Sequence, residues 1–374
     1  MARLGLIVNP IAGMGGRVGL KGTDGADVLA RAQRLGAVPD AEERADRALA
    51  RLERQGADVV VVTAAGAMGA DIAARHPFAT EVVGPGRRDD ETTTAADTRA
   101  AAADLVSREV DLILFAGGDG TARDIHDVVG ESVPILGVPT GVKMHSGVFA
   151  GTPEAAGDVA ASFIASTPPR PVRQADVLDI DEEAVRCGTI STRLYGAACV
   201  PDDRLRVPGA KQSAPPSDEV ALDAVCAEVA DELDPRRIYV LGPGTTTRRV
   251  MRHLGLPKTL LGVDAVRAGR LLGADLGEHE LLDLIGEEPA TVVIGVVGGQ
   301  GALLGRGNQQ ISPAVLRRVG AENIEVIAGL RKLLELQPAV LHVDTGDPEL
   351  DQLLCGYRRV HVAPRRTLVC RVAA

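Results

Sequence analysis

Hydrophobic residues in the first part of the chain are concentrated in short runs, and segments with helical spacing separate these runs. Four runs are rich in Val, Ile and Leu: residues 4–8, 58–62, 111–116 and 133–138. Such runs indicate strands that are buried on both faces of a sheet. The intervening residues 26–55 and 94–106 alternate Ala or Leu with polar and charged positions at helical spacing, and residues 124–129 add a short helix. The pattern therefore predicts strands that are joined by helices.

Strands that alternate with helices predict a parallel sheet with right-handed crossovers, whose ligands bind at the carboxyl ends of the strands. We expect residues 1–168 to form a Rossmann-like N-terminal lobe that binds nucleotide or phosphate. Three prolines within residues 168–171 cannot continue a helix, so a linker is expected there. The remaining residues 169–374 are expected to form a C-terminal acceptor-binding lobe.

The C-terminal lobe has a mixed pattern. Residues 172–180 and 189–200 alternate as antiparallel strands do, and residues 208–217 form a polar loop. Further strands are expected at residues 238–241, 260–263, 292–297, 324–327 and 340–343, and helices at residues 246–253, 279–285, 313–319, 330–336 and 348–354. The fold class is therefore α/β, with a mixed α/β C-terminal lobe that contains some antiparallel strands.

Length and composition restrict the function. A chain of 374 residues exceeds the usual size of one hydrophobic core, which predicts two lobes with a ligand cleft between them. Aromatic residues make up 2% of the chain and the net charge is -10, which argues against nucleic acid as a partner. An acidic protein that binds anionic nucleotides must concentrate positive potential locally, and glycine loops at helix N-termini can do so.

The cellular compartment is expected to be the cytoplasm. The five cysteines are widely spaced and include no Cys-x-x-Cys pair, which is typical of reduced, buried thiols. The apolar run at residues 4–8 is too short for a signal peptide, and no segment approaches 18 uninterrupted apolar residues. No membrane partner is expected.

The turn Gly-Gly-Asp-Gly-Thr at residues 117–121 follows a buried strand and precedes a helix. Its glycines let a phosphate approach the backbone, and Asp119 is able to cap the helix, hold a divalent metal or accept a proton. A simple turn with an aspartate cap is an equal alternative for an isolated motif of this kind. The position between strand and helix favours a nucleotide loop.

Two glycine-rich segments of the C-terminal lobe offer further anion sites. Residues 242–247 read Gly-Pro-Gly-Thr-Thr-Thr before Arg248, and residues 298–310 contain five glycines with Arg306 and Asn308. The first is alternatively a Thr-rich helix cap. Asp264, Asp344 and Asp347 fall at strand ends and are candidates for metal or ribose contacts, although the last two are equally consistent with turn and cap residues.

The segment Leu-Ile-Val-Asn-Pro-Ile-Ala-Gly at residues 6–13, followed by Gly-Gly-Asp-Gly-Thr, resembles the superfamily of NAD kinases and diacylglycerol or sphingosine-type lipid kinases. The glycine segments at residues 242–247, 298–301 and 305–310, with Asp-Thr-Gly-Asp at 344–347, resemble its subgroup related to acetoin-catabolism protein X. The resemblance implies that the glycine turn binds the phosphoryl donor and that Asp119 acts as base. Asn9 would orient the nucleotide, and the loop at residues 137–141 would face it.

The resemblance implies a kinase that uses ATP and Mg²⁺, forms a homo-oligomer, and phosphorylates the 2′-hydroxyl of NAD to give NADP. Two departures concern the acceptor. NAD kinases carry an Asn-Glu or Asn-Asp pair that has no counterpart near residues 194–198, and their C-terminal lobe is mostly a β-sandwich. The alternatives are a kinase for another small hydroxylated metabolite, such as a diol or sugar, and a regulatory protein that binds NAD or ATP without turnover.

Asp119 is the candidate catalytic residue, and no metal ligand is assigned. Lys143 and His145 are able to contact phosphate, but for His145 a solvated loop residue is slightly favoured. The candidate nucleotide-binding residues are Asn9, Pro10, Gly117, Gly118, Gly120, Thr121, Thr140, Gly141, Gly244, Thr245, Thr246, Thr247, Gly299, Gln300, Arg306 and Asn308.

Overall fold

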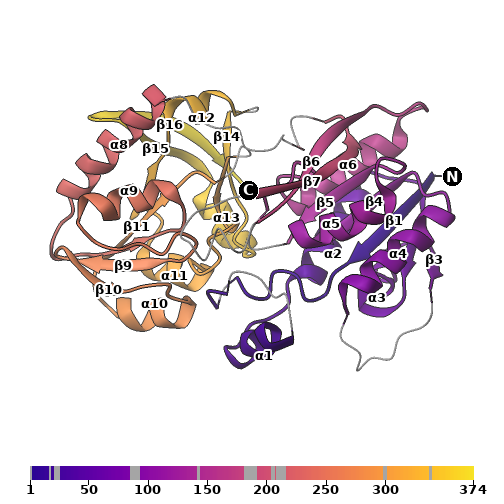
Figure 1. The fold of residues 1–374 in the computed structure, drawn as a ribbon, viewed down its shortest axis with the longest axis horizontal. Coiled ribbons are helices and arrows are strands. Elements are labelled where there is room, and N and C mark those ends of the chain that lie inside the picture. The colour runs from indigo at the N-terminus through magenta and orange to yellow at the C-terminus, as the bar shows by residue number, and fades with distance from the viewer. Residues whose placement is uncertain are drawn as a thin grey trace. The chain divides into compact units, whose positions relative to one another are not determined.

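The computed structural model forms two compact units, which are described separately (Figure 1). The described residues are 2–16, 18–20, 26–84, 93–140, 144–180, 192–203, 207, 216–297, 301–336 and 339–374. The N-terminal unit comprises Met1–Met14, Gly22–Leu29 and Val38–Ala210, and the C-terminal unit comprises Gly15–Lys21, Ala30–Ala37 and Lys211–Ala374. This division places residues 169–210, which were expected in the C-terminal lobe, in the N-terminal unit.

The N-terminal unit contains a five-stranded parallel sheet with the order β3-β2-β1-β4-β5. The strands are β1 (Ala2–Val8), β2 (Val59–Ala64), β3 (Ala79–Val83), β4 (Leu112–Gly117) and β5 (Ile135–Pro139). The expected α/β fold with a parallel N-terminal sheet is confirmed. The hydrophobic runs predicted four of these strands, whereas β3 was missed because its first four residues are not buried.

Helices lie on both faces of this sheet (Figure 1). Helices α2 (Ala41–Arg54) and α6 (Pro153–Ala165) pack together against one face, and α4 (Ala95–Ser107) and α5 (Asp119–Val129) pack together against the other. The single helix expected at residues 26–55 is instead α1 (Ala26–Arg34) followed by α2. Gly36 has a φ of 79° and Pro39 follows, so the chain turns between the two helices. Shorter elements are η1 (Gly66–Met68) and α3 (Ala70–Ala73).

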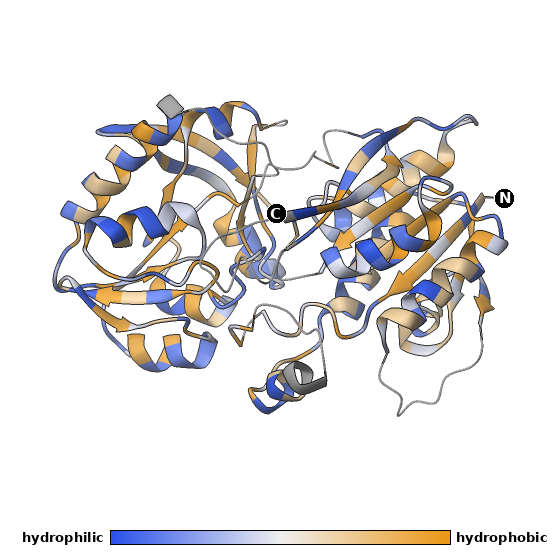
Figure 2. Cartoon of the chain, viewed as in Figure 1, coloured by the Kyte–Doolittle hydropathy of each residue, from blue (hydrophilic) through white to orange (hydrophobic). Residues whose placement is uncertain are grey.

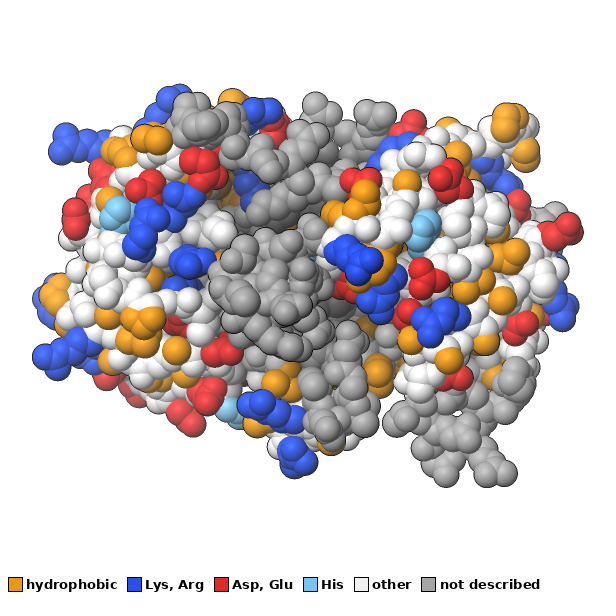
Figure 3. All heavy atoms as spheres, viewed as in Figure 1, with side chains coloured by type: hydrophobic (Ala, Val, Ile, Leu, Met, Phe, Trp, Pro, Cys, Tyr) orange, Lys and Arg blue, Asp and Glu red, His pale blue; other side chains and the backbone are white. Residues whose placement is uncertain are grey.

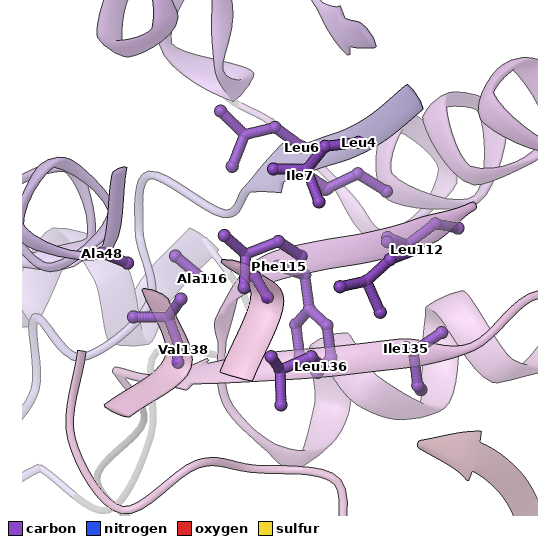
Figure 4. Packing of buried hydrophobic residues seen from close by; sticks show 14 of the residues in the cluster. Leu4, Leu6, Ile7, Ala48, Leu112, Phe115, Ala116, Ile135, Leu136 and Val138 are labelled. Atoms are coloured by element: carbon purple, nitrogen blue, oxygen red, sulfur yellow. The ribbon is translucent and has the colours of Figure 1, made fainter. Parts of the chain in front are cut away.

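The core of this unit lies between the strands and their helices. Side chains of β1, β4 and β5 interleave in Figure 4, and the strands of the sheet are largely hydrophobic in Figure 2. The rings of Phe115 and Phe149 meet edge to face with centroids 5.4 Å apart, and both are fully buried. Gly137 makes room for this pair, since a Cβ atom there would lie 2.2 Å from the Phe149 ring.

A hairpin of β6 (Val172–Ile180) and β7 (Thr192–Pro201) completes the N-terminal unit and packs against α5 and β5. Both strands were expected and are antiparallel. The register shifts between Val177 and Leu178, which pair with Gly196 and Leu194 respectively. Tyr195 is therefore the extra residue of a bulge, and such a bulge redirects a side chain locally.

The C-terminal unit contains a nine-stranded mixed sheet with the order β10-β9-β8-β11-β13-β15-β16-β14-β12. Its strands are β8 (Ile238–Leu241), β9 (Asp264–Arg267), β10 (Arg270–Gly273), β11 (Ala290–Gly295), β12 (Ala302–Leu304), β13 (Ile324–Ile327), β14 (Val340–Val343), β15 (Gly356–Ala363) and β16 (Arg366–Ala373). Strands β8, β11 and β13 are parallel, and β8–β9 and β15–β16 are antiparallel. The expected mixed lobe is confirmed, although the strand expected at residues 260–263 begins at Asp264.

The helices of the C-terminal unit are α8 (Pro216–Asp231), α9 (Thr245–His253), α10 (Glu278–Ile285), α11 (Pro313–Val319), α12 (Leu330–Leu334) and α13 (Pro348–Leu354). Among the described helix starts of this unit, those of α11 and α13 have a capping side chain followed by proline. Ser312 accepts a hydrogen bond from the Val315 N–H, and Asp347 accepts one from the Leu350 N–H. A capping acceptor and a proline at the first helical position both favour helix initiation, so these starts are fixed locally.

On the face drawn in Figure 3, basic and acidic side chains of the described residues are interspersed. Such a mixture is typical of a solvated surface. None of the helices in the described part of the chain combines the length and the apolar character needed to cross a membrane.

We predict that Phe149→Ala lowers the free energy of unfolding of the N-terminal unit by about 3–5 kcal/mol, because it leaves a cavity beside Phe115 of β4 and Gly137 of β5. Urea unfolding monitored by hydrogen exchange of β4 and β5 measures the change. Val128→Ala, at a side chain that is 37% exposed, is the control and should shift stability by less than about 0.5 kcal/mol. Equal effects of the two substitutions would contradict this assignment of the core.

Candidate active site

The carboxyl ends of β1 and β4 lie side by side at the point where the strand order of the N-terminal sheet reverses. From β1 the chain proceeds outward to β2 and β3, and from β4 it proceeds to β5 on the other side. In open α/β sheets, ligands bind in the crevice at such a switch point. Asn9 follows β1 and Gly118 follows β4, so the two predicted motifs meet there.

Asn9 joins the two strand ends. Its side-chain Nδ2 donates to the Thr121 hydroxyl at 3.0 Å, and its backbone N–H donates to the Ala116 carbonyl at 2.9 Å. The Asn9 Oδ1 also accepts from the Ile11 N–H at 3.3 Å, which fixes the turn that contains Pro10. The amide of Asn9 thus holds the loop after β1 to the first turn of α5.

The first turn of α5 presents backbone N–H groups without a side-chain cap. Its cap is Gly118, which has extended backbone angles and makes no capping hydrogen bond. Gly117 packs against Thr121 so closely that a Cβ atom would lie 2.5 Å from the Thr121 side chain. A helix N-terminus carries partial positive charge and orphan N–H groups, so this turn is suited to an anion.

Asp119 is buried, with a side chain that is 4% exposed. Its Oδ2 accepts from the His145 N–H at 2.6 Å and its Oδ1 from the Ser146 N–H at 3.0 Å. The His145 Nδ1 lies 3.3 Å from the same Oδ2. Asp119 therefore does not cap α5 but binds residues 145–146 to the beginning of that helix.

The loop that contacts Asp119 is held in turn by the hairpin. The Ser146 hydroxyl donates to the Leu178 carbonyl at 2.8 Å and accepts from the Leu178 N–H at 3.0 Å. The Gly147 N–H donates to the Asp176 carbonyl at 2.9 Å. The part of β6 that lies opposite the bulge in β7 therefore positions the donors of the catalytic candidate.

Thr140 closes the edge of the site beside β5. It is 2% exposed, its N–H donates to the Gly117 carbonyl at 3.2 Å, and its hydroxyl donates to the Val138 carbonyl at 3.1 Å. The neighbouring candidates Gly141 and Lys143 lie outside the described residues. The Thr140 hydroxyl is thus used in a hydrogen bond to the backbone carbonyl two residues earlier.

A charged cluster lies one turn further along α5. Arg123 pairs with Asp179 of β6 at 2.6 Å, and its guanidinium lies 5.5 Å from the centre of the Tyr195 ring. Burial opposes the charge of Arg123, but Asp179 and Asp124 outweigh it and raise the Arg123 pKa. Arg99 also pairs with Asp124, at 2.6 Å. The cation beside the site is therefore permanently charged and fixed in place.

In the C-terminal unit, residues 242–247 connect β8 to α9. Gly244 has a φ of 112° and is the cap of α9, again without a side-chain cap. Thr245 is exposed, and Thr246 lies beside Gly295 at the end of the neighbouring strand β11. Thr247 is fully buried, and its hydroxyl donates to the Gly242 carbonyl at 2.5 Å. The predicted position of this loop at a strand end agrees with the structure.

The second glycine-rich segment begins after β11, the strand beside β8, and its residues Gly305, Arg306 and Asn308 follow β12. Asn308 is 1% exposed, accepts from the Gly305 N–H at 3.0 Å and donates to the Leu303 carbonyl at 2.9 Å. Arg306 is 9% exposed. The candidates Gly299 and Gln300 lie outside the described residues. The Asn308 side chain stabilises the shape of its own loop.

The remaining aspartate candidates have structural partners. Asp264 is fully buried and accepts from the Thr259 N–H at 2.8 Å and from the Asp275 N–H at 2.8 Å. The Lys258 ammonium lies 3.3 Å from its Oδ2. Asp347 caps α13 and pairs with an arginine of α11 at 2.6 Å. Within the described residues, no group of three or more His, Cys, Asp or Glu side chains is arranged to hold a metal ion.

A nearby cysteine does not provide a reactive thiol. The Cys226 thiol lies 3.5 Å from the Thr246 carbonyl, beneath the first turn of α9. Desolvation by burial raises the pKa of Cys226 to about 12, so the thiol stays protonated at neutral pH. The raised pKa therefore disfavours the thiolate form that nucleophilic chemistry requires.

An uncapped helix N-terminus at the switch point of a parallel sheet is typical of α/β proteins that bind nucleotides or phosphate. Comparison with protein families agrees with this class: residues 4–167 match the ATP-NAD kinase N-terminal domain and residues 236–372 match the ATP-NAD kinase C-terminal domain. The chain belongs to the ATP-NAD kinase family. No curated protein sequence matches it.

Sequence reasoning overlooked two residues of the site and undervalued a third. Arg44 of α2 is 8% exposed and donates to the Pro139 carbonyl, but in sequence it is one of many arginines in an amphipathic helix. Ser146 was not considered. His145 is not the solvated loop residue that was slightly favoured, because it is half-buried against Asp119. The sequence contained one indication of this role, because His145 closely follows the glycine-containing loop at residues 137–141.

We predict that Asp119→Asn loosens the loop at residues 144–146, because an NH₂ group then faces one of two N–H donors. The free energy of unfolding of the N-terminal unit should fall by about 1–3 kcal/mol. Hydrogen exchange at His145 and Ser146 measures the local effect. Asp127→Asn, at an exposed position of the same helix, is the control. Unchanged protection in the Asp119 variant would contradict the observed hydrogen bonds.

We predict that Thr247→Val lowers the stability of the C-terminal unit by about 1–3 kcal/mol, because the Gly242 carbonyl loses its buried donor. Thr247→Ser keeps the hydroxyl and should retain most of the stability. Chemical denaturation compares these variants with Thr245→Val at the exposed neighbouring position. A Thr247→Ser variant as unstable as Thr247→Val would show that packing, and not the hydrogen bond, matters.

Proposed function

We propose that the protein transfers the γ-phosphoryl group of ATP to a hydroxyl group, with the 2′-hydroxyl of NAD as the leading acceptor and NADP as the product. The observation that carries the proposal is the joined pair of motifs at the switch point of the N-terminal sheet. There the Asn9 side chain binds Thr121 in the uncapped first turn of α5, and Asp119 begins the same turn. Membership of the ATP-NAD kinase family supports the reaction class.

The N-terminal unit supplies the contacts that phosphoryl transfer needs most. The reaction depends on in-line positioning and on neutralising charge that spreads over phosphate oxygens. We assign the donor phosphates to the N–H groups of Gly118, Gly120 and Thr121, where the two glycines let the backbone approach closely. Asn9, Pro10, Gly117, Thr140 and Gly141 shape the surrounding loops in this proposal. Asp119 is its catalytic carboxylate and promotes removal of the proton from the attacking hydroxyl.

The loops of the C-terminal sheet are assigned to nucleotide binding as well. Gly244, Thr245 and Thr246 form the uncapped beginning of α9, a second place where backbone N–H groups face an anion. Arg306, which follows β12, is assigned to the same role, as are Gly299 and Gln300, which lie outside the described residues. Thr247 and Asn308 act by holding these loops in shape, since their side chains bind backbone groups.

Magnesium belongs to the proposal as the counterion of ATP. Mg²⁺ in kinases is commonly bound through substrate phosphates together with one or two carboxylates. Because the described residues contain no group of three or more metal-ligating side chains, we assign no residue of this chain as its ligand. When bound, the ion would neutralise charge on the β- and γ-phosphates.

A second candidate is a kinase for another small hydroxylated metabolite, such as a diol or a sugar. The specific observation in its favour is the C-terminal unit, whose mixed α/β sheet differs from the β-sandwich expected of NAD kinases. The segments that resemble the subgroup related to acetoin-catabolism protein X all belong to this unit. A regulatory protein that binds NAD or ATP without turnover is the remaining alternative.

We predict that the purified protein converts NAD to NADP in the presence of ATP and Mg²⁺, and that Asp119→Ala lowers kcat by at least about 100-fold. A coupled NADP-specific dehydrogenase assay measures the product. Circular dichroism of the variant controls for the fold, and Asp127→Ala on the same helix should keep native activity. NADP formation no higher than in the Asp119 variant would contradict NAD as the acceptor.

A thermal-shift panel of nucleotides, diols and sugars, followed by a phosphate-transfer assay on each ligand that binds, separates the alternatives. Transfer to a diol or sugar favours the metabolite kinase, and binding without transfer favours the regulatory protein. Analytical ultracentrifugation tests the homo-oligomer that the resemblance implies.

A further inference from the structure

One face of α5 leads from the candidate catalytic carboxylate along the β6–β7 hairpin. Asp119, Arg123 and His126 are four and three residues apart, so their side chains leave the helix on the same side. Four residues of an α-helix span about 6 Å. The helix packs against both strands of the hairpin (Figure 1). A ligand group beside Asp119 therefore has the side chain of Arg123 one helical turn away.

The hairpin brings an aromatic ring and a second arginine to this face. Gly196 approaches α5 closely, because a Cβ atom there would lie 2.2 Å from the His126 Nε2. Tyr195, the extra residue of the bulge, precedes this glycine, and the Arg123 guanidinium lies 5.5 Å from its ring centre. The Arg193 guanidinium lies 5.3 Å from the same centre. The tyrosine ring therefore holds two guanidinium groups near one another.

The charges of this cluster do not balance. Arg123 pairs with Asp179 of β6, and Arg99 of α4 pairs with Asp124. Arg193 is exposed, and the side-chain contact that the described residues offer it is the aromatic ring. Three arginines thus face two aspartates. Because neighbouring guanidinium groups repel each other, the cluster favours a further anion.

The two arginines beside the ring lie apart from the place assigned to the donor phosphates. Those phosphates are assigned to the N–H groups at the beginning of α5, whereas Arg123 lies one turn further along and Arg193 comes from β7. A guanidinium group matches a phosphate or a carboxylate with two parallel hydrogen bonds. A hydroxyl group and an anionic group of one small molecule can therefore reach Asp119 and the arginines together.

We propose that Arg123 and Arg193 bind an anionic group of the molecule that is phosphorylated, and that Tyr195 is the positioning residue that holds them. This inference rests on the proposed kinase function and specifies the class of its acceptor. Asp119 remains the catalytic carboxylate. The acceptor is accordingly a hydroxyl compound that carries a phosphate or a carboxylate. NAD belongs to this class through its phosphates, whereas a neutral diol or sugar does not.

A binding measurement without ATP tests the anion site directly. Side-chain NMR of arginine-labelled full-length protein follows Arg123 and Arg193 during titration with NAD, glycerol 3-phosphate, glycerate and glycerol. The signals should shift saturably with the anions, with a Kd at least about tenfold lower than for glycerol. A shift with glycerol 3-phosphate but not with glycerate identifies phosphate as the bound group. Unchanged signals with all three anions, or equal binding of glycerol, would overturn the proposal.

Substitutions of Arg193 test its role during turnover. With NAD as acceptor, Arg193→Ala should raise the KM for NAD by about 10–100-fold, while kcat and the KM for ATP change less than about threefold. Arg193→Lys should have a smaller effect, and Arg193→Glu a larger one, because a carboxylate repels the anion. Arg34→Ala removes an exposed charge from α1 and is the control. A native KM for NAD in Arg193→Glu would overturn the proposal, and an equal rise in the KM for ATP would make this arginine a donor contact.

The positioning role of Tyr195 is tested by a conservative pair. Tyr195→Phe keeps the ring and should leave the KM for NAD within about threefold of the native value, whereas Tyr195→Leu should raise it as Arg193→Ala does. Leu194→Ala, at an exposed neighbouring position, is the control. A native KM in Tyr195→Leu would contradict the positioning role.

The two kinds of measurement separate failure of this inference from failure of the proposed function. Binding of NAD that shifts the Arg193 signal, without phosphoryl transfer to NAD or to any other acceptor, would count against the proposed function alone. Phosphoryl transfer that proceeds with native acceptor KM in Arg193→Glu would overturn the anion site and leave the kinase standing.

Discussion

The buried carboxylate of Asp119 must be satisfied by hydrogen-bond donors, and this requirement organises the N-terminal site. An unpaired buried charge would cost several kcal/mol, so the donors have to be held in place. They come from His145 and Ser146, which follow β5, whereas Asp119 follows β4. The hydrogen bonds thereby join the loops after two neighbouring strands. Asn9 adds the loop after β1, and the three strand ends become one rigid edge.

The two units share a turn between a buried strand and a helix, but different side chains stabilise that turn in each unit. Both place a glycine-capped helix after a buried parallel strand, α5 after β4 and α9 after β8. In the first, a carboxylate occupies the first helical position and recruits a neighbouring loop. In the second, the buried hydroxyl of Thr247 bonds back to the Gly242 carbonyl and tightens the turn. In the proposed function, the first arrangement places a carboxylate and an imidazole beside an anion site, whereas the second supplies an anion site alone.

Much of the fold could be predicted because buried parallel strands have an unmistakable pattern. The runs at residues 4–8 and 111–116 became β1 and β4, and the residues after them, Asn9 and Thr121, are in contact. Strands β15 and β16 were missed because their outer face is exposed and carries residues such as Tyr357. The strand expected at residues 260–263 begins later, since Lys258 and Asp264 form a buried pair that shapes the preceding loop. The contact between His145 and Asp119 spans 26 residues, and no local pattern reveals it.

The link between Ser146 and Leu178 has a mechanical consequence. At the bulge of the hairpin, one hydroxyl satisfies both backbone groups of Leu178, while the N–H of the same serine binds Asp119. The hairpin is therefore hydrogen-bonded to Ser146, the residue next to His145. Twisting or displacing β6 would move the donors of the carboxylate with it, so the alignment of Asp119 depends on a strand that holds the loop through backbone groups.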